Sequence, residues 1–207
     1  QSLQQYQVEM NMARMYLESD RITYLLLNPD DMANLHDAQH DPNTDLADLK
    51  IDCHAFRVHF NRANPDLTAE STCLMEDYRN YFVGHNPDKW ASNVGLYRQL
   101  DYANMYEGID LRFYGVDGNI KYDFIVAPSA NVAQIEFEYE GLDNLFIQDD
   151  NLHIVTSVNT IVEQKPYAYQ YISGQLMEVA CAFVISEDNK LSFTFPEGYD
   201  ETQELII

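Results

Sequence analysis

Apolar and polar residues alternate with a period of two along much of the chain, and this feature limits the fold more than any other. Every second residue is apolar over 109–113 and again over 120–126. Between these runs lies Val116-Asp117-Gly118-Asn119, in which Asp-Gly favours the positive backbone angles of a tight hairpin turn. Since successive side chains of a strand point to opposite faces, the segment predicts a β-hairpin with one buried face.

The same pattern returns at short intervals toward the C-terminus, with turn residues between the runs. Further strands are predicted over 135–139, 152–156, 159–162, 167–172, 176–185 and 191–195. The second half of 176–185 is apolar on both faces, which is typical of a central strand. With 207 residues the chain is long enough for one large β domain. We therefore predict a single all-β domain over 1–207, an antiparallel β-sandwich-like fold with helix limited to short turns.

The N-terminal part is less regular. Residues 12–18 and 21–27 predict a hairpin around Ser19-Asp20, and 51–60 predicts another strand. Between them, 28–50 is polar and rich in Asp and Asn, so we expect a long acidic loop that is the most mobile part of the domain.

The charge balance excludes two classes of partner. The chain has 12 Lys and Arg against 34 Asp and Glu, a net charge of −22. Such a surface repels nucleic acid and anionic lipid, and no basic cluster offsets it. No apolar run reaches the length of a membrane span. We expect a solvated surface, no nucleic-acid partner and no insertion into a membrane.

Catalytic patterns are absent from the sequence. It contains no Gly-x-Ser-x-Gly, and Cys53-His54 follows no known catalytic arrangement. His36 and His40 have the spacing of one helix face but lack the Glu of a zinc-protease motif. Asp110 and Asp123 lie near basic residues on predicted paired strands, which indicates charge pairing on a solvated face. The sequence therefore predicts a protein that is not an enzyme.

One acidic stretch of the predicted loop has oxygen-bearing side chains at alternate positions, as calcium loops do. The candidate ligands are Asp41, Asn43, Asp45, Asp48 and Asp52. However, Leu46 stands where an EF-type loop needs Gly, and Asp52 replaces the bidentate Glu. Two interpretations remain, a calcium site or a flexible acidic loop, and the departures favour the loop. No other cofactor is expected.

Aromatic residues supply the candidate ligand-binding positions, because an exposed ring can stack on a sugar. The candidates are Trp90, Tyr97, Tyr167, Tyr169 and Tyr171. Strand alternation places the last three on one face, where they form either a surface stripe or part of the core. For the single Trp, packing is the alternative to binding.

The three cysteines have no metal-binding spacing. Cys181 alternates with apolar residues, which predicts a buried free thiol. Cys53 and Cys73 either form a disulfide in an oxidising compartment or remain free.

Several segments together resemble a known family. They are Asn80-Tyr81-Phe82-Val83-Gly84, Asn86-Pro87-Asp88-Lys89-Trp90, Tyr122-Asp123-Phe124-Ile125-Val126-Ala127-Pro128 and Lys165-Pro166-Tyr167-Ala168-Tyr169-Gln170. The chain, from about Ala13 to Ile207, resembles the N-terminal domain that precedes SBBP-type β-propeller repeats or gliding-motility-type C-terminal domains in large secreted Bacteroidetes proteins. The resemblance implies export, often by type IX secretion, and location at the cell surface, and it transfers no catalytic residues.

These observations lead to one expectation of function and one alternative. We expect a non-catalytic, extracellular structural or adhesive module, a fragment of a longer multidomain protein. Its expected partners are neighbouring domains of the same chain, other surface proteins or glycans. The alternative is a carbohydrate-binding accessory module of a protein that acts on polysaccharides.

Overall fold

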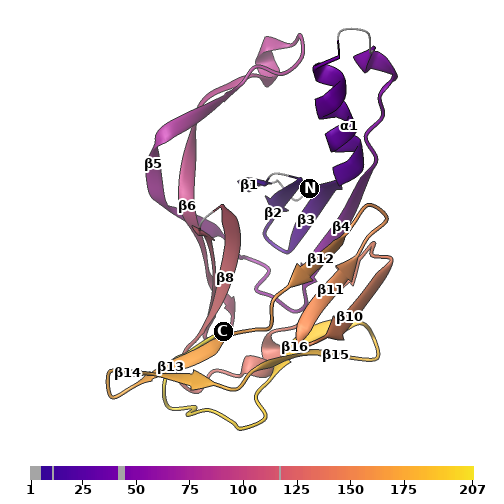
Figure 1. Cartoon of the computed structure of the whole chain (residues 1–207). Helices are drawn as coiled ribbons and strands as arrows, with labels where there is room; N and C mark the ends of the chain where they lie inside the picture. Colours follow the sequence, from indigo (N-terminus) through magenta and orange to yellow (C-terminus); the bar gives the residue numbers. More distant parts are fainter. Residues whose placement is uncertain (1–5, 11, 42–44, 117) are drawn as a thin grey trace.

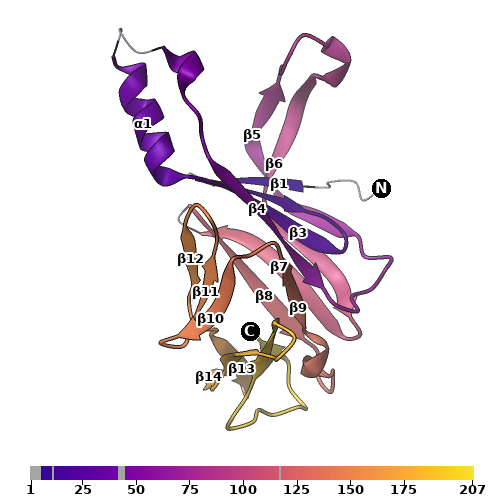
Figure 2. The ribbon, with the colours of Figure 1, turned by 90° about the vertical axis from the view of Figure 1, so that its right-hand side faces the viewer.

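Two large antiparallel sheets and one small sheet make up the computed structural model, which confirms the predicted all-β, sandwich-like class. The structure describes residues 6–10, 12–41, 45–116 and 118–207. The large sheets have seven strands each, and the small sheet has three. In Figure 1 the large sheets form two sides of the molecule, and Figure 2 shows the same arrangement turned by 90°.

The first large sheet has the strand order β1-β2-β3-β4-β9-β16-β15. Its strands are β1 (Tyr6–Met10), β2 (Ala13–Leu17), β3 (Arg21–Leu27), β4 (Cys53–Phe60), β9 (Phe137–Glu140), β15 (Ala182–Ile185) and β16 (Lys190–Thr194). The predicted hairpin around Ser19-Asp20 is β2–β3, in which Leu17 pairs with Ile22.

The second large sheet has the order β14-β13-β17-β8-β7-β6-β5. Its strands are β5 (Ala69–Tyr81), β6 (Ala91–Tyr106), β7 (Ile109–Val116), β8 (Asn119–Val126), β13 (Ala168–Ile172), β14 (Gln175–Val179) and β17 (Leu205–Ile206). The predicted hairpin of 109–126 is β7–β8, and its register runs from Ile109 opposite Val126 to Val116 opposite Asn119. Asp117 of its turn lies outside the described residues.

The small sheet consists of β10 (Asn144–Gln148), β11 (Asn151–Val155) and β12 (Thr160–Glu163). Leu152 and Ile154 of β11 are buried in the common core, so this sheet packs against the sandwich.

The core lies between the facing sheets. Leu111 and Phe124 of the second sheet and Phe56 and Phe137 of the first are at most 5% exposed. The rings of Phe124 and Phe137 meet across the interface at 5.6 Å between centroids. The apolar residues of the alternating pattern therefore face one shared core.

The prediction of a continuous central strand over 176–185 is wrong. β14 ends at Val179 in one sheet and β15 begins at Ala182 in the other, and both are edge strands. The residues between them are apolar because the chain passes from one sheet to the other beside the core.

The prediction of a loop throughout 28–50 is also wrong, as is the limit of helix to single turns. Residues Pro29–Gln39 form helix α1 of 11 residues. The Asn28 side chain accepts from the backbone N–H groups of Asp30 and Asp31, and Pro29 occupies the first turn. Asn-Pro-Asp-Asp is thus a helix N-terminus. The three remaining helical segments, η1 (Leu46–Asp48), η2 (Pro87–Lys89) and η3 (Val132–Gln134), are single turns.

Candidate functional site

A long hairpin projects from one edge of the second sheet, and we call its outer part, residues 74–98, the arm. β6 pairs with β7 from Gln99 onward, so the arm is a two-stranded ribbon of β5 and β6 alone. Figures 1 and 2 both show it extending away from the sheets on the same end of the molecule as α1.

The arm exposes many apolar side chains. Leu74 is 66% exposed and Val83 is 73% exposed. The full set is Leu74, Tyr78, Phe82, Val83, Trp90, Val94 and Tyr97. A two-stranded ribbon is only marginally stable in water without a surface to pack against. Because large exposed apolar patches mark interaction sites, the arm is a candidate contact surface.

Local contacts shape the tip of the arm. The Trp90 indole N–H donates to the Gly84 carbonyl oxygen at 3.3 Å, and its ring meets that of Phe82 edge-on at 5.5 Å. Asn86 caps η2 by accepting from the Asp88 backbone N–H at 3.0 Å. Trp90 therefore packs within the tip while remaining 43% exposed, so packing and binding are compatible at this position.

Irregularities in the pairing bend the arm. The register of β5 against β6 shifts between Leu74 and Tyr78 and again between Arg79 and Tyr81. Asn93 has a φ of 56°, and its backbone N–H donates to the Asn80 side chain at 2.9 Å. Such bulges increase the local twist and turn a ribbon away from its sheet.

Three predicted tyrosines, two on β13 and one directly before it, form a surface stripe. Tyr167, Tyr169 and Tyr171 have consecutive ring centroids 5.8 Å apart. Tyr167 and Tyr171 are more than half exposed, and Tyr169 is half-buried. β13 lies next to edge strand β14, whereas the arm continues the opposite edge of the same sheet. The predicted ligand-binding residues therefore form two separate surfaces, Trp90 with Tyr97 on the arm and the tyrosine stripe on β13.

Two of the described calcium candidates take part in local hydrogen bonds. The Asp45 side chain caps η1 by accepting from the Ala47 N–H at 2.9 Å, and the Asp52 N–H donates to the Asp31 carboxylate at 2.9 Å. Asn43 lies outside the described residues. Within the described ranges, no three His, Cys, Asp or Glu side chains come together as metal ligands, and Asp41 and Asp48 are part of no such group.

The carboxylates of the β7–β8 hairpin have structural partners. Asp110 Oδ1 accepts from the Asn104 backbone N–H at 2.7 Å, and Asp123 Oδ1 accepts from the Tyr114 hydroxyl at 2.9 Å. Arg112 lies opposite both Asp123 of β8 and Asp101 of β6, and its Nε donates to Asp101 Oδ1 at 2.7 Å. Burial raises the pKa of Asp101, but hydrogen bonds from Arg112, Gln99 and Thr72 more than offset it, and the pKa is lowered. Sequence alone did not indicate this partner, because β6 was not among the predicted strands.

The cysteines are free thiols in the structure. Cys53 of β4 and Cys73 of β5 are both exposed and belong to different sheets, so the disulfide alternative is not formed. Cys181 is half-buried rather than fully buried, and burial raises its pKa to about 12.

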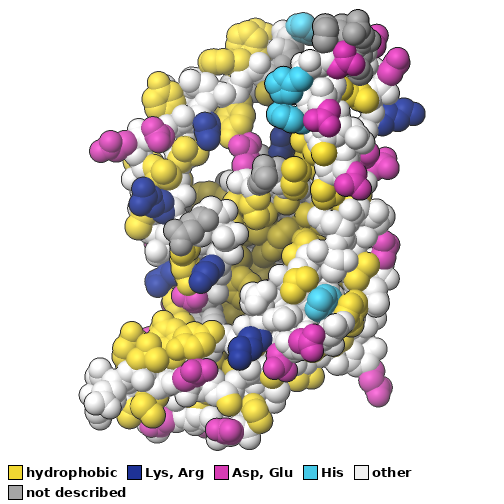
Figure 3. Space-filling view, in the orientation of Figure 1, with side chains coloured by type: hydrophobic (Ala, Val, Ile, Leu, Met, Phe, Trp, Pro, Cys, Tyr) yellow, Lys and Arg dark blue, Asp and Glu magenta, His cyan; other side chains and the backbone are white. Residues whose placement is uncertain are grey.

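A hollow between the two large sheets was not indicated by the sequence. It contains about 350 Å³ of space free of atoms, part of it open to solvent, and Figure 3 shows its apolar floor. The lining residues are Ile22, Tyr24, Val58, Phe60, Leu111, Phe113, Tyr122, Phe124, Phe137, Tyr139 and Glu163. Strands from all three sheets contribute to it, so no local pattern could have predicted it.

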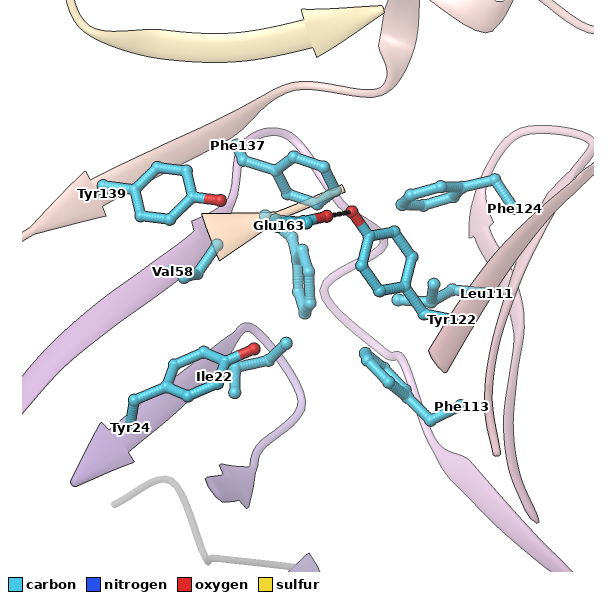
Figure 4. Close-up of a pocket in the computed structure, with 11 residues that line it drawn as sticks. Ile22, Tyr24, Val58, Leu111, Phe113, Tyr122, Phe124, Phe137, Tyr139 and Glu163 are labelled. Atoms are coloured by element: carbon cyan, nitrogen blue, oxygen red, sulfur yellow. Dashed lines mark hydrogen bonds between the residues drawn. The ribbon is translucent and has the colours of Figure 1, made fainter. Parts of the chain in front are cut away.

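Glu163, the last residue of β12, extends into this hollow (Figure 4). The Tyr122 hydroxyl donates a hydrogen bond to its carboxyl group. Burial raises the pKa of Glu163, and this hydrogen bond only partly offsets the effect. Burial also raises the pKa values of Tyr24, Tyr122 and Tyr139.

The fold and these surfaces define an all-β domain with an exposed contact arm and an aromatic hollow. The whole chain, residues 1–207, matches the family model described as "Domain of unknown function (DUF7948)", and the chain belongs to this family. No curated protein and no solved structure is significantly similar to it. None of the helices in the described part is both long and apolar enough to cross a membrane.

Proposed function

We propose that the domain is a non-catalytic structural or adhesive module of an exported cell-surface protein, and that it makes its contacts through the arm. The observation that supports this proposal is the set of exposed apolar side chains on a ribbon beside which no further strand of the described residues lies. Neighbouring domains or other surface proteins are its proposed partners. The sequence resemblance to domains of large secreted Bacteroidetes proteins is the basis for the location.

Side chains on the arm offer contact area at a low cost in conformational entropy. Tyr78, Phe82 and Tyr97 have few rotatable bonds, so ordering them on a partner loses little entropy. Burying the exposed apolar area would also stabilise the ribbon itself. The proposed contact therefore explains both the exposure and the length of the hairpin.

The test compares surface variants in one binding assay. The labelled domain is added to cells of its source organism, as wild type, as Leu74→Ser/Phe82→Ser/Tyr97→Ser, and as the control Leu176→Ser/Met177→Ser on β14. We expect binding to fall at least about tenfold for the arm variant only, a loss typical of removing interface anchors. Equal binding by all three proteins, or no binding by the wild type, contradicts the proposal.

A second candidate function is carbohydrate binding, which the tyrosine stripe favours. Tyr167 and Tyr171 are exposed rings on one strand face, suited to stacking on consecutive sugars. A glycan array with the wild type and Tyr167→Ala/Tyr171→Ala tests it. Glycan binding that is lost in this variant supports the second candidate, and an array without signal contradicts it.

A further inference from the structure

The charge balance inside the hollow is incomplete. Glu163 is the only acidic residue among the lining side chains, and none of the described lining residues is Lys, Arg or His. The titratable groups around it are the hydroxyls of Tyr24 on β3, Tyr122 on β8 and Tyr139 on β9. These hydroxyls carry no positive charge, and the Tyr122 hydrogen bond stabilises the carboxylate only in part. An ionised carboxylate in such surroundings is unfavourable unless a cation enters.

The walls of the hollow suit an organic cation. The ring planes of Phe113 and Tyr122 meet at 53°, those of Tyr122 and Phe124 at 79°, and those of Phe124 and Phe137 at 44°. The rings therefore surround the space from several directions, as Figure 4 shows. Aromatic rings attract ammonium groups through their negative faces, and the attraction is strongest away from water.

The size of the space agrees with a small ligand group. The enclosed part of the hollow is much smaller than the pockets that hold drug-sized ligands, so it has room only for a small group. A hydrated metal ion would leave the rings without a role, and a neutral sugar would leave the carboxyl group without a counter-charge. An alkylammonium group satisfies both features.

We infer that this hollow binds an alkylammonium group, with Glu163 as its counter-ion and the surrounding aromatic rings as its walls. This inference is independent of the arm and of the proposed adhesive function. The ammonium group belongs either to a small free amine or to a lysine side chain. Binding displaces the proton that the carboxyl group otherwise retains, so affinity rises with pH until Glu163 is fully ionised.

The test is isothermal titration calorimetry of the whole 207-residue chain with three probes: n-butylammonium, its neutral counterpart 1-butanol, and Nα-acetyl-lysine methylamide. We expect butylammonium to bind at least tenfold more tightly than butanol at pH 8. Binding of the lysine derivative as well identifies a polypeptide source, and its exclusion identifies a small amine. Equal affinities for butylammonium and butanol, or no binding of either cation, overturn the inference.

Two variants separate the counter-ion from the fold. Glu163→Gln keeps the shape of the side chain and should lose at least tenfold in butylammonium affinity. Its affinity for butanol should equal that of the wild type, and its butylammonium affinity should no longer change with pH. Glu138→Gln is the matched control, since Glu138 is exposed on β9 between two lining residues. Circular dichroism verifies that both variants are folded. Unchanged ammonium affinity in Glu163→Gln overturns the inference, as does an equal loss in the control.

Discussion

Tyr122 of β8 donates a hydrogen bond to the carboxyl group of Glu163 of β12, and this contact joins the second large sheet to the small sheet. The two residues are separated by 41 positions, and both line the hollow. Because the hydroxyl is a neutral donor, it stabilises an ionised Glu163 only in part.

Replacing Glu163 should therefore stabilise the domain at neutral and alkaline pH. The pKa of Glu163 is raised in the folded state, so the folded protein retains a proton that the unfolded chain loses near pH ~4.3. The free energy of unfolding of the wild type therefore falls as the pH rises from ~4.3 to above the pKa of Glu163 in the folded state. We expect Glu163→Gln to be more stable by ~1–3 kcal/mol at pH 8 and equal to the wild type below pH ~4.

Urea denaturation at pH 3.5, 6 and 8 measures this difference, with Glu138→Gln as the control that should follow the wild type. The contrary outcome is a Glu163→Gln variant that is less stable than the wild type at pH 8 but not at pH 3.5. It would show that the folded state stabilises the ionised carboxylate.

The fold class could be predicted because each strand carries its own local signal. In β7 every second residue from Ile109 to Phe113 is buried, as are Phe124 and Val126 of β8, and the Asp-Gly pair in the sequence predicts a tight turn between the two strands. Residues 176–185 carried a misleading signal, because an apolar crossover between two sheets has the same composition as a central strand.

The hollow could not be predicted, for a different reason. Tyr24, Tyr122, Tyr139 and Glu163 are each ordinary strand residues, and only the packing of three sheets brings them together. By contrast, the period of one strand was enough to place Tyr167, Tyr169 and Tyr171 on one face, but it left open whether that face is exposed or part of the core.

The facing sheets should depend strongly on single core side chains. Leu111 of β7 is 1% exposed in the core, whereas Leu176 of β14 is 47% exposed. We expect Leu111→Ala to lower the free energy of unfolding by ~2–5 kcal/mol, because it leaves a cavity, and Leu176→Ala to change it by less than ~0.5 kcal/mol. Chemical denaturation measures both. Equal effects would contradict the assignment of the core.

Helix α1 should depend on its N-cap. None of its residues is buried, so packing adds little to the stability of the helix. The hydrogen bonds to the Asn28 side chain are therefore a main stabilising interaction of its first turn. Asn28→Ala should destabilise the helix by ~0.5–2 kcal/mol, whereas Asn28→Asp retains the acceptor. Amide hydrogen exchange over 32–39 should accelerate in the Ala variant only, with β7 and β8 unaffected. Unchanged exchange in that variant would mean that other contacts hold the helix.

The three cysteines should differ in reactivity because they differ in exposure. The thiolate is the reactive form, and burial raises the pKa of Cys181 to about 12, whereas Cys53 and Cys73 are exposed. With Ellman's reagent at pH 8, we expect two thiols to react rapidly in the native protein and the third only after denaturation. Cys181→Ser should leave the rapid phase intact and remove the slow thiol. Three rapid thiols would contradict the protection of Cys181, and a native protein without rapid thiols would show that Cys53 and Cys73 are joined in a disulfide.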